Sequence, residues 1–229
     1  MTPADNVFYF NNDIDLRVCL KNAYTTMRTA WLWCGKTDLR FKDEDYQEIL
    51  HRYTGHSGHG SSPSRYRECM KYQDIWNIPF RRGSYKIAIR RDPVERFKSA
   101  VSHLNRTRIH KDYSSEEGKE YIDLTHVTID DIDKVLDAMD NQLIRDEHFF
   151  SQTYFMGMPN EYDKIYNLNE VGDLLKWLQK KCPPRLGVDI TSLWANKTKD
   201  TESRITLTPE QTMRVIKFYA KDYANGWYY

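Results

Sequence analysis

Residues 89–99 read IRRDPVERFKS, and this stretch decides the fold because a buried strand turns directly into a helix there. The segment from Tyr85 to Ile89 is short and mostly apolar, which predicts a strand. Asp92 is a favoured N-cap, Pro93 a favoured first helical residue, and Glu95 completes a capping box. The stretch therefore predicts a strand, a tight turn and a helix, in that order.

The same alternation recurs on both sides of this stretch. Leu16 to Leu20 predicts a buried strand, followed by a helix through about Cys34 that Gly35 ends, and Lys164 to Tyr166 predicts a third strand. The helix that begins at Pro93 has its apolar stripe over residues 97–104. Apolar periodicity predicts further helices over residues 43–53, 130–144 and 168–178 and from Thr208 onward. Strands that alternate with helices predict an α/β fold: a single domain over residues 1–229, with a mostly parallel sheet flanked by helices. Residues 107–128 are polar and predict an exposed insertion.

The charge balance and the cysteine content exclude some classes of protein. The 229 residues carry 34 basic and 33 acidic side chains, for a formal net charge of +1. A general nucleic-acid binder would carry a strong basic excess, so we expect no nucleic-acid partner, and any anion site must be local. Four cysteines match neither a zinc pattern nor a CxxC pair, which favours free thiols. The sequence shows no signal peptide and no transmembrane run, so the expectation is a soluble, cytoplasmic protein without a membrane partner.

The residues that follow two of the predicted strands could bind phosphate groups. In parallel sheets, ligands bind beyond the carboxyl ends of the strands. The first is a loop over residues 20–28, in which Lys21, Asn22, Ala23, Tyr24, Thr25 and Thr26 follow the first predicted strand. Backbone N–H groups at a helix N-terminus stabilise anions, and the lysine and the hydroxyls add donors. The glycines of a Walker A loop are missing, and simple helix capping is the alternative interpretation.

The second is the motif over residues 89–99. Arg91 ends a strand and Ser99 lies in the second helical turn, so a fork-shaped donor and a hydroxyl are available to a phosphate. The alternative interpretation is an ordinary strand, an Asp-Pro cap and a surface helix.

Together and in this order, the two motifs resemble those of the PAPS-dependent sulfotransferases, where PAPS is 3′-phosphoadenosine 5′-phosphosulfate. Residues 20–25 resemble the family's Pro-Lys-x-x-x-Thr loop, with Leu20 in place of Pro, and residues 91–99 match its Arg-Asp-Pro-x-x-Arg-x-x-Ser motif. The resemblance is closest to the carbohydrate sulfotransferases (chondroitin 4-O-, HNK-1-type and heparan sulfate 2-O-type) and extends over residues 16–225. It includes the segments 146–149, 162–170, 196–198 and 218–223. The anchor, stem and disulfide-forming cysteines of those enzymes are missing, which favours a bacterial or viral source.

The resemblance implies a P-loop-like sulfotransferase fold and transfer of a sulfuryl group from PAPS to a hydroxyl, on a carbohydrate acceptor, without a metal. It implies that the loop, with Lys21 as its charged catalytic residue, holds the 5′-phosphosulfate. Arg91 and Ser99 would bind the 3′-phosphate, and Lys197, Thr198 and Arg204 would close over the nucleotide.

The acceptor hydroxyl needs a general base, and imidazole titrates in the suitable range. His59, His56 and His148 are the three candidates, and each is also explicable as a solvated or packing histidine. Two other functions stay open: a kinase-like, nucleotide-dependent phosphotransferase, and a module that binds PAP (the desulfated donor) or another nucleotide without catalysis. The sequence leaves the acceptor and the oligomeric state undetermined.

Overall fold

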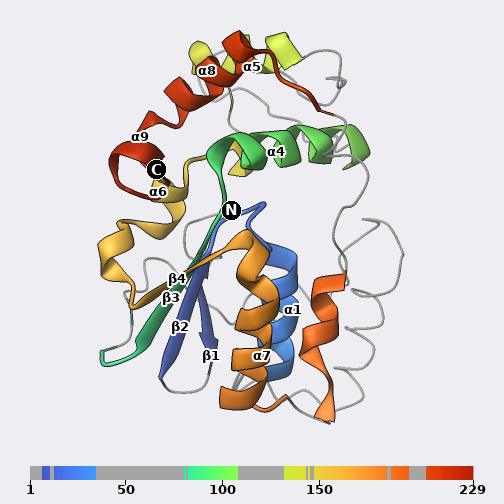
Figure 1. The fold of residues 1–229 in the computed structure, drawn as a ribbon, viewed down its shortest axis with the longest axis vertical. Coiled ribbons are helices and arrows are strands. Elements are labelled where there is room, and N and C mark those ends of the chain that lie inside the picture. Colours follow the sequence, from blue (N-terminus) through green and yellow to red (C-terminus); the bar gives the residue numbers. More distant parts are fainter. Residues whose placement is uncertain are drawn as a thin grey trace, which may run out of the picture. The chain divides into compact units, whose positions relative to one another are not determined.

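A computed structural model gives the fold, and it describes residues 7–10, 13–34, 80, 82–107, 132–142, 144, 147–184, 187–195 and 205–228. Its sheet has four strands in the order β1-β2-β3-β4. These are β1 (Val7–Phe10), β2 (Ile14–Val18), β3 (Tyr85–Arg90) and β4 (Lys164–Asn167). β1 pairs with β2 antiparallel and β2 with β3 parallel, and β3 and β4 point the same way (Figure 1). The α/β class and the mostly parallel sheet are confirmed.

The chain divides into two compact units, each built from separate stretches of sequence. The first contains residues 1–18, 23–89 and 162–195, and the second contains residues 19–22, 90–161 and 196–229. The expectation of a single domain over residues 1–229 therefore stays a prediction.

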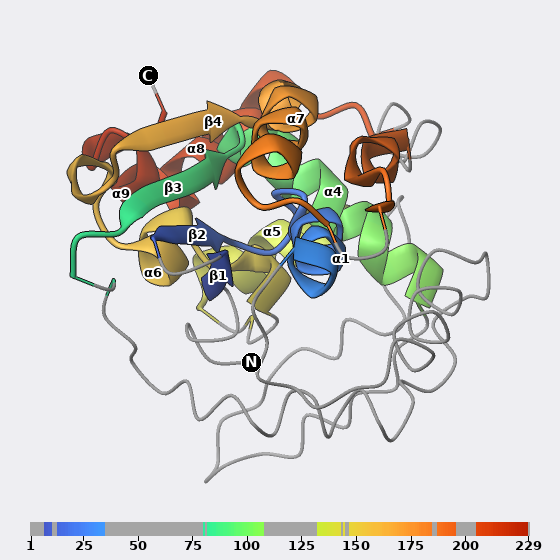
Figure 2. The same ribbon diagram turned by 90° about the horizontal axis from the view of Figure 1, so that it is seen from below.

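The first unit holds the sheet and the helices α1 (Tyr24–Cys34) and α7 (Val171–Lys181), with the short 3₁₀ helices η6 (Leu168–Glu170) and η8 (Ile190–Ala195). α1 and α7 lie side by side (Figures 1 and 2), and η8 packs against both. Ile14 pairs with Tyr85 and Leu16 with Ile87, so these side chains share one face of the sheet, and the ring of Tyr85 meets that of Trp177 in α7. Burial of this apolar face stabilises the unit.

The first long strand lies two residues earlier than the sequence predicts. β2 covers Ile14–Val18 because each of its residues pairs with one of β3, from Tyr85 to Ile89. The strand includes Asp15, which is fully buried and accepts a 2.9 Å hydrogen bond from the hydroxyl of Ser84. A buried carboxylate with a partner is compatible with a strand interior, whereas sequence pattern alone treats it as a break.

The described part of the second unit is helical. It contains α4 (Pro93–Thr107), α5 (Ile132–Asp140), η4 (Glu147–Phe149), α6 (Gln152–Met156), η5 (Pro159–Glu161), α8 (Pro209–Phe218) and α9 (Ala220–Ala224). α8 packs against both α4 and α5. The shared core consists of Phe97, Ala100, Val101, Ile132, Val135, Leu136, Met139, Phe149, Ile205, Val215 and Tyr219. The apolar stripes predicted on these helices therefore face one another.

Two predicted helix starts are confirmed in this unit. The amide of Glu95 donates to the Asp92 carboxylate at 2.9 Å, and Thr208 forms a reciprocal capping box with Gln211. The carboxylate of Glu95 is bonded to Lys98 at 2.7 Å. The remaining predictions, a helix over residues 43–53 and the insertion after Thr107, lie outside the described residues.

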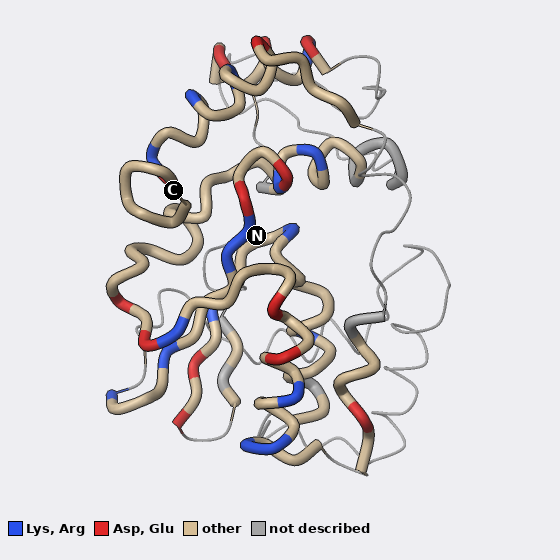
Figure 3. Tube along the Cα trace, viewed as in Figure 1, with Lys and Arg blue, Asp and Glu red and all other residues tan. Residues whose placement is uncertain are grey.

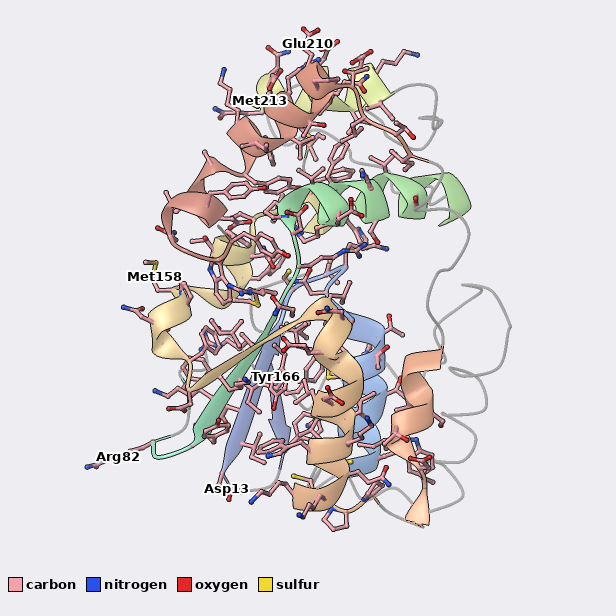
Figure 4. All side chains as sticks on the ribbon, viewed as in Figure 1. Asp13, Arg82, Met158, Tyr166, Glu210 and Met213 are labelled. Atoms are coloured by element: carbon pink, nitrogen blue, oxygen red, sulfur yellow. The ribbon has the colours of Figure 1, made fainter. Side chains whose placement is uncertain are left out.

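Acidic residues of the second unit gather along α5, which carries Asp133, Asp137 and Asp140, and α8 has Glu210 in its first turn (Figure 3). Glu210 and Met213 point away from α8 (Figure 4), and Met213 is 62% exposed. Within the described part of the chain, no helix has the length and apolar character needed to cross a membrane.

Candidate functional site

The loop that follows β2 has an unusual backbone. Lys21 has φ 69° and Ala23 has φ 64°, and the amide of Asn22 between them donates to the carbonyl of Cys19 at 3.1 Å. Non-glycine residues in this left-handed region are strained, each by about 1 kcal/mol, and such strain gathers at functional sites. The tight turn begins where the sequence predicts an anion-binding loop.

Arg91 joins this loop to the second motif. Its Nη1 donates a 2.9 Å hydrogen bond to the carbonyl oxygen of Lys21, although 70 residues separate the two in sequence. Arg91 is only 8% exposed, and both residues belong to the second unit. The two motifs that sequence reasoning linked by family resemblance are therefore in direct contact.

Gln152 also connects the two motifs, and sequence reasoning assigned it no role. Its Oε1 accepts hydrogen bonds from the Nδ2 of Asn22 at 2.7 Å and from the backbone N–H of Arg91 at 2.9 Å. Gln152 and Asn22 are both fully buried. The sequence around Gln152 predicted no element, and a single polar residue gives no signal of such contacts.

Asp222 fixes the position of Gln152 from the other side. One oxygen of this buried carboxylate accepts from the backbone N–H of Gln152 at 2.9 Å, and the other accepts from that of Thr153 at 2.8 Å. Ser151 caps the same helix by accepting from the amide of Tyr154. Asp222 lies in the segment 218–223 that carries part of the family resemblance, but its role was not predicted.

Arg96, in the middle of the 89–99 motif, is a structural residue. Its guanidinium is fully buried, donates to the carbonyl oxygens of His148 and Phe150, and lies 4.8 Å from the ring centroid of Tyr219. Burial alone would lower the pKa of this guanidinium. Its neighbours Tyr219, Cys19 and Asp222 outweigh burial and raise the pKa above its ordinary value. Arg96 therefore stays charged and binds the backbone within η4 and directly after it.

The structure brings together three of the predicted site residues: Lys21, Asn22 and Arg91. Lys21 is half-buried, whereas the amide of Asn22 is turned to Gln152 inside the protein. Ser99 is in the same unit, in α4, and is 3% exposed. Its hydroxyl is thus far less accessible than a surface hydroxyl.

The remaining described candidates have other surroundings. Ala23, Tyr24, Thr25 and Thr26 belong to the first unit, at the N-terminal end of α1, and Thr25 is exposed there while Tyr24 is buried. His148 is half-buried in η4, with its carbonyl bound by Arg96. The candidates outside the described residues are His56, His59, Lys197, Thr198 and Arg204.

The described cysteines are free, as predicted. Cys19, Cys34 and Cys182 are buried, and burial raises the pKa of Cys19 and Cys34 to about 12 and that of Cys182 to about 11. At neutral pH these thiols are protonated and inert as nucleophiles. Within the described ranges, no three or more His, Cys, Asp or Glu side chains are grouped to hold a metal ion.

Comparisons of the chain with protein-family models, with curated proteins and with solved structures found no match.

Proposed function

We propose that this protein is a PAPS-dependent sulfotransferase that transfers a sulfuryl group to a hydroxyl, with a carbohydrate as the acceptor class. The hydrogen bond from Arg91 to the Lys21 carbonyl is the observation that supports this function best. PAPS carries charge at both its 5′ and its 3′ positions, so its protein site needs two anion-binding motifs held close together. A strained loop with a lysine, bonded directly to an arginine at a strand end, meets that requirement.

The proposed reaction is an in-line transfer. The acceptor oxygen forms a bond to sulfur while the bond between sulfur and the bridging oxygen of the 5′-phosphate breaks, and PAP leaves with that electron pair. The acceptor proton passes to a general base, for which His148, His56 and His59 are the candidates. The ammonium of Lys21 would neutralise the charge that develops on the bridging oxygen.

Arg91 and Ser99 are proposed to recognise the 3′-phosphate. A guanidinium has five N–H donors, and the bond to the Lys21 carbonyl uses one of them. The same side chain can therefore fix the loop and bind an anion. Because only the 3′-phosphate distinguishes PAP from common adenine nucleotides, this contact would determine nucleotide specificity.

Nucleotide binding and sulfate transfer test the proposal. We expect PAP to raise the melting temperature without magnesium, and ATP to raise it much less. A Lys21→Ala variant should lose turnover of labelled PAPS on a panel of oligosaccharides, lipids and small alcohols. The matched control is Lys176→Ala, which removes an exposed lysine that pairs with the exposed Asp173.

Three outcomes separate the alternatives. An equal response to ATP and PAP that needs magnesium would favour a kinase-like phosphotransferase. Binding of PAP without transfer to any acceptor would favour a binding module. Normal turnover in Lys21→Ala would contradict the catalytic role of this lysine.

A further inference from the structure

Gln152 lies at the centre of the contacts that join the two anion-binding motifs of the second unit. One side-chain oxygen accepts from the Asn22 side chain and from the Arg91 backbone, and both bonds are buried. Arg91 in turn donates to the Lys21 carbonyl. One direct bond and one bridge through Gln152 therefore connect Lys21 and Asn22 to Arg91.

The orientation of this amide follows from its partners. The backbone N–H of Arg91 can only donate, so the Gln152 atom that faces it must be the oxygen. The Asn22 side chain must then present its nitrogen to the same oxygen. The Nε2 of Gln152 is buried and has no hydrogen-bond partner among the described residues. All the bonding of this side chain thus passes through its oxygen.

Gln152 is itself held rigidly. Both oxygens of Asp222 accept backbone N–H groups from the first turn of α6, and Asn225 donates to the hydroxyl of Thr153 at 3.2 Å. A side chain that starts from a backbone fixed in this way has little freedom to follow a displaced loop. Movement of either motif would therefore break one of its two bonds.

We propose that Gln152 is a positioning residue that sets the spacing between the 5′-phosphosulfate loop and the 3′-phosphate motif. The inference rests on the proposed function and deepens it. Gln152 touches neither phosphate group in this scheme. It favours a nucleotide that carries both phosphates over one that carries either alone, because only the nucleotide with two phosphate groups needs both motifs at a fixed separation.

Calorimetric binding of three probes separates positioning from general damage: PAP, adenosine 5′-phosphate and adenosine 3′-phosphate. In Gln152→Met, which keeps the side-chain length but removes the acceptor, we expect PAP affinity to fall at least tenfold. Each monophosphate should lose less than threefold. Gln152→Asn keeps an amide but shortens the side chain by one carbon, so its oxygen cannot reach both donors, and this variant should lose the preference for PAP as Gln152→Met does.

Thr153→Val is the matched control. It removes a polar contact from the neighbouring residue of the same helix, the bond from Asn225, without touching either motif. This variant should keep the parent's preference for PAP. A similar loss for all three probes in Gln152→Met would overturn the positioning role and indicate structural damage. If Gln152→Met does not fold, Gln152→Asn decides alone, and an unchanged PAP preference in that variant would contradict the inference.

The inference and the proposed function fail in different ways. A parent protein that binds PAP no better than adenosine 5′-phosphate would overturn both. A parent that binds PAP selectively, with an unchanged preference in a folded Gln152→Met variant, would leave the proposed function standing and eliminate the positioning role.

Discussion

The guanidinium of Arg91 lies 2.9 Å from the carbonyl oxygen of Lys21, so a strand end and a loop 70 residues away share one hydrogen bond. This bond uses a single donor of a group that has several. Arg91 therefore differs from a lysine at the same position, whose one ammonium would have to serve both the carbonyl and a bound anion.

We predict that Arg91→Lys lowers PAP affinity at least tenfold, or about 1.4 kcal/mol, because the fork geometry is lost. Titration calorimetry measures this change. Arg90→Lys is the matched control, since the neighbouring Arg90 donates to the Trp227 carbonyl at 3.4 Å. Equal losses in the two variants would show that Arg91 has no special role in binding.

Ala23 gives a prediction of unusual sign. Its φ of 64° strains an L-residue but not glycine. We expect Ala23→Gly to raise the free energy of unfolding by roughly 0.5 kcal/mol, because relief of strain exceeds the extra chain entropy. Urea denaturation measures this change. Ala30→Gly, at a buried position inside α1, should lower stability by at least about 0.5 kcal/mol. A destabilised Ala23→Gly variant would contradict the left-handed backbone.

Arg214 connects two helices of the second unit through three acidic groups of α5. Its guanidinium lies 2.6 Å from Asp137, 2.7 Å from Asp140 and 3.8 Å from Asp133, and the bond to Asp137 is the main cause of its raised pKa. We predict that Arg214→Met lowers stability by about 1 kcal/mol in low salt and by less in 1 M salt, since these groups are partly exposed.

The control for this network is Lys176→Met, which breaks an exposed pair within one helix and should cost less than about 0.5 kcal/mol. Chemical denaturation at two salt concentrations measures both variants. A loss in Arg214→Met that does not change with salt would attribute the effect to packing instead of charge.

We predict that the buried thiol of Cys19 lowers the free energy of unfolding at alkaline pH. Burial raises the pKa of its thiol from 9.0 to about 12, so above pH 9 the unfolded chain releases a proton that the folded chain keeps. The stabilisation is complete below pH 9 and falls as the pH rises towards 12, by roughly 1 kcal/mol at pH 10. In Cys19→Ala, the drop in unfolding free energy between pH 8 and pH 10 should be smaller by this amount. The cavity left by Cys19→Ala lowers stability equally at both pH values, so it does not affect this difference. Identical drops in the parent and in Cys19→Ala would contradict the prediction.

The sequence predicted the local elements of this fold well. Helix starts such as Asp92 and Thr208 depend on residues a few positions away, and both caps are present. Strand β2 was misplaced by two residues because its limits depend on pairing with β3, about 70 residues later. Edge strand β1 was not predicted, although its run of Val, Phe and Tyr residues favours a strand.

The candidate site was predicted only in part, because some of its contacts depend on residues that are distant in sequence. Lys21 and Arg91 were found because motifs and a family resemblance mark them. Gln152 and Asp222 were assigned no role, because a buried side-chain bridge depends on which distant groups tertiary packing brings together. Asn22 was expected to face a ligand, but its amide is directed to Gln152.

The wide separation of these partners has a consequence for how the protein is made. Asn22 and Gln152 are 130 residues apart, and Asp222 follows Gln152 by a further 70. At a translation speed of 5–20 residues per second, the loop waits roughly 7–26 s on the ribosome before Gln152 is synthesised. During that interval the loop lacks the Gln152 acceptor for the Asn22 amide. The strained turn around Lys21 and Ala23 therefore gains its full set of contacts only late in synthesis.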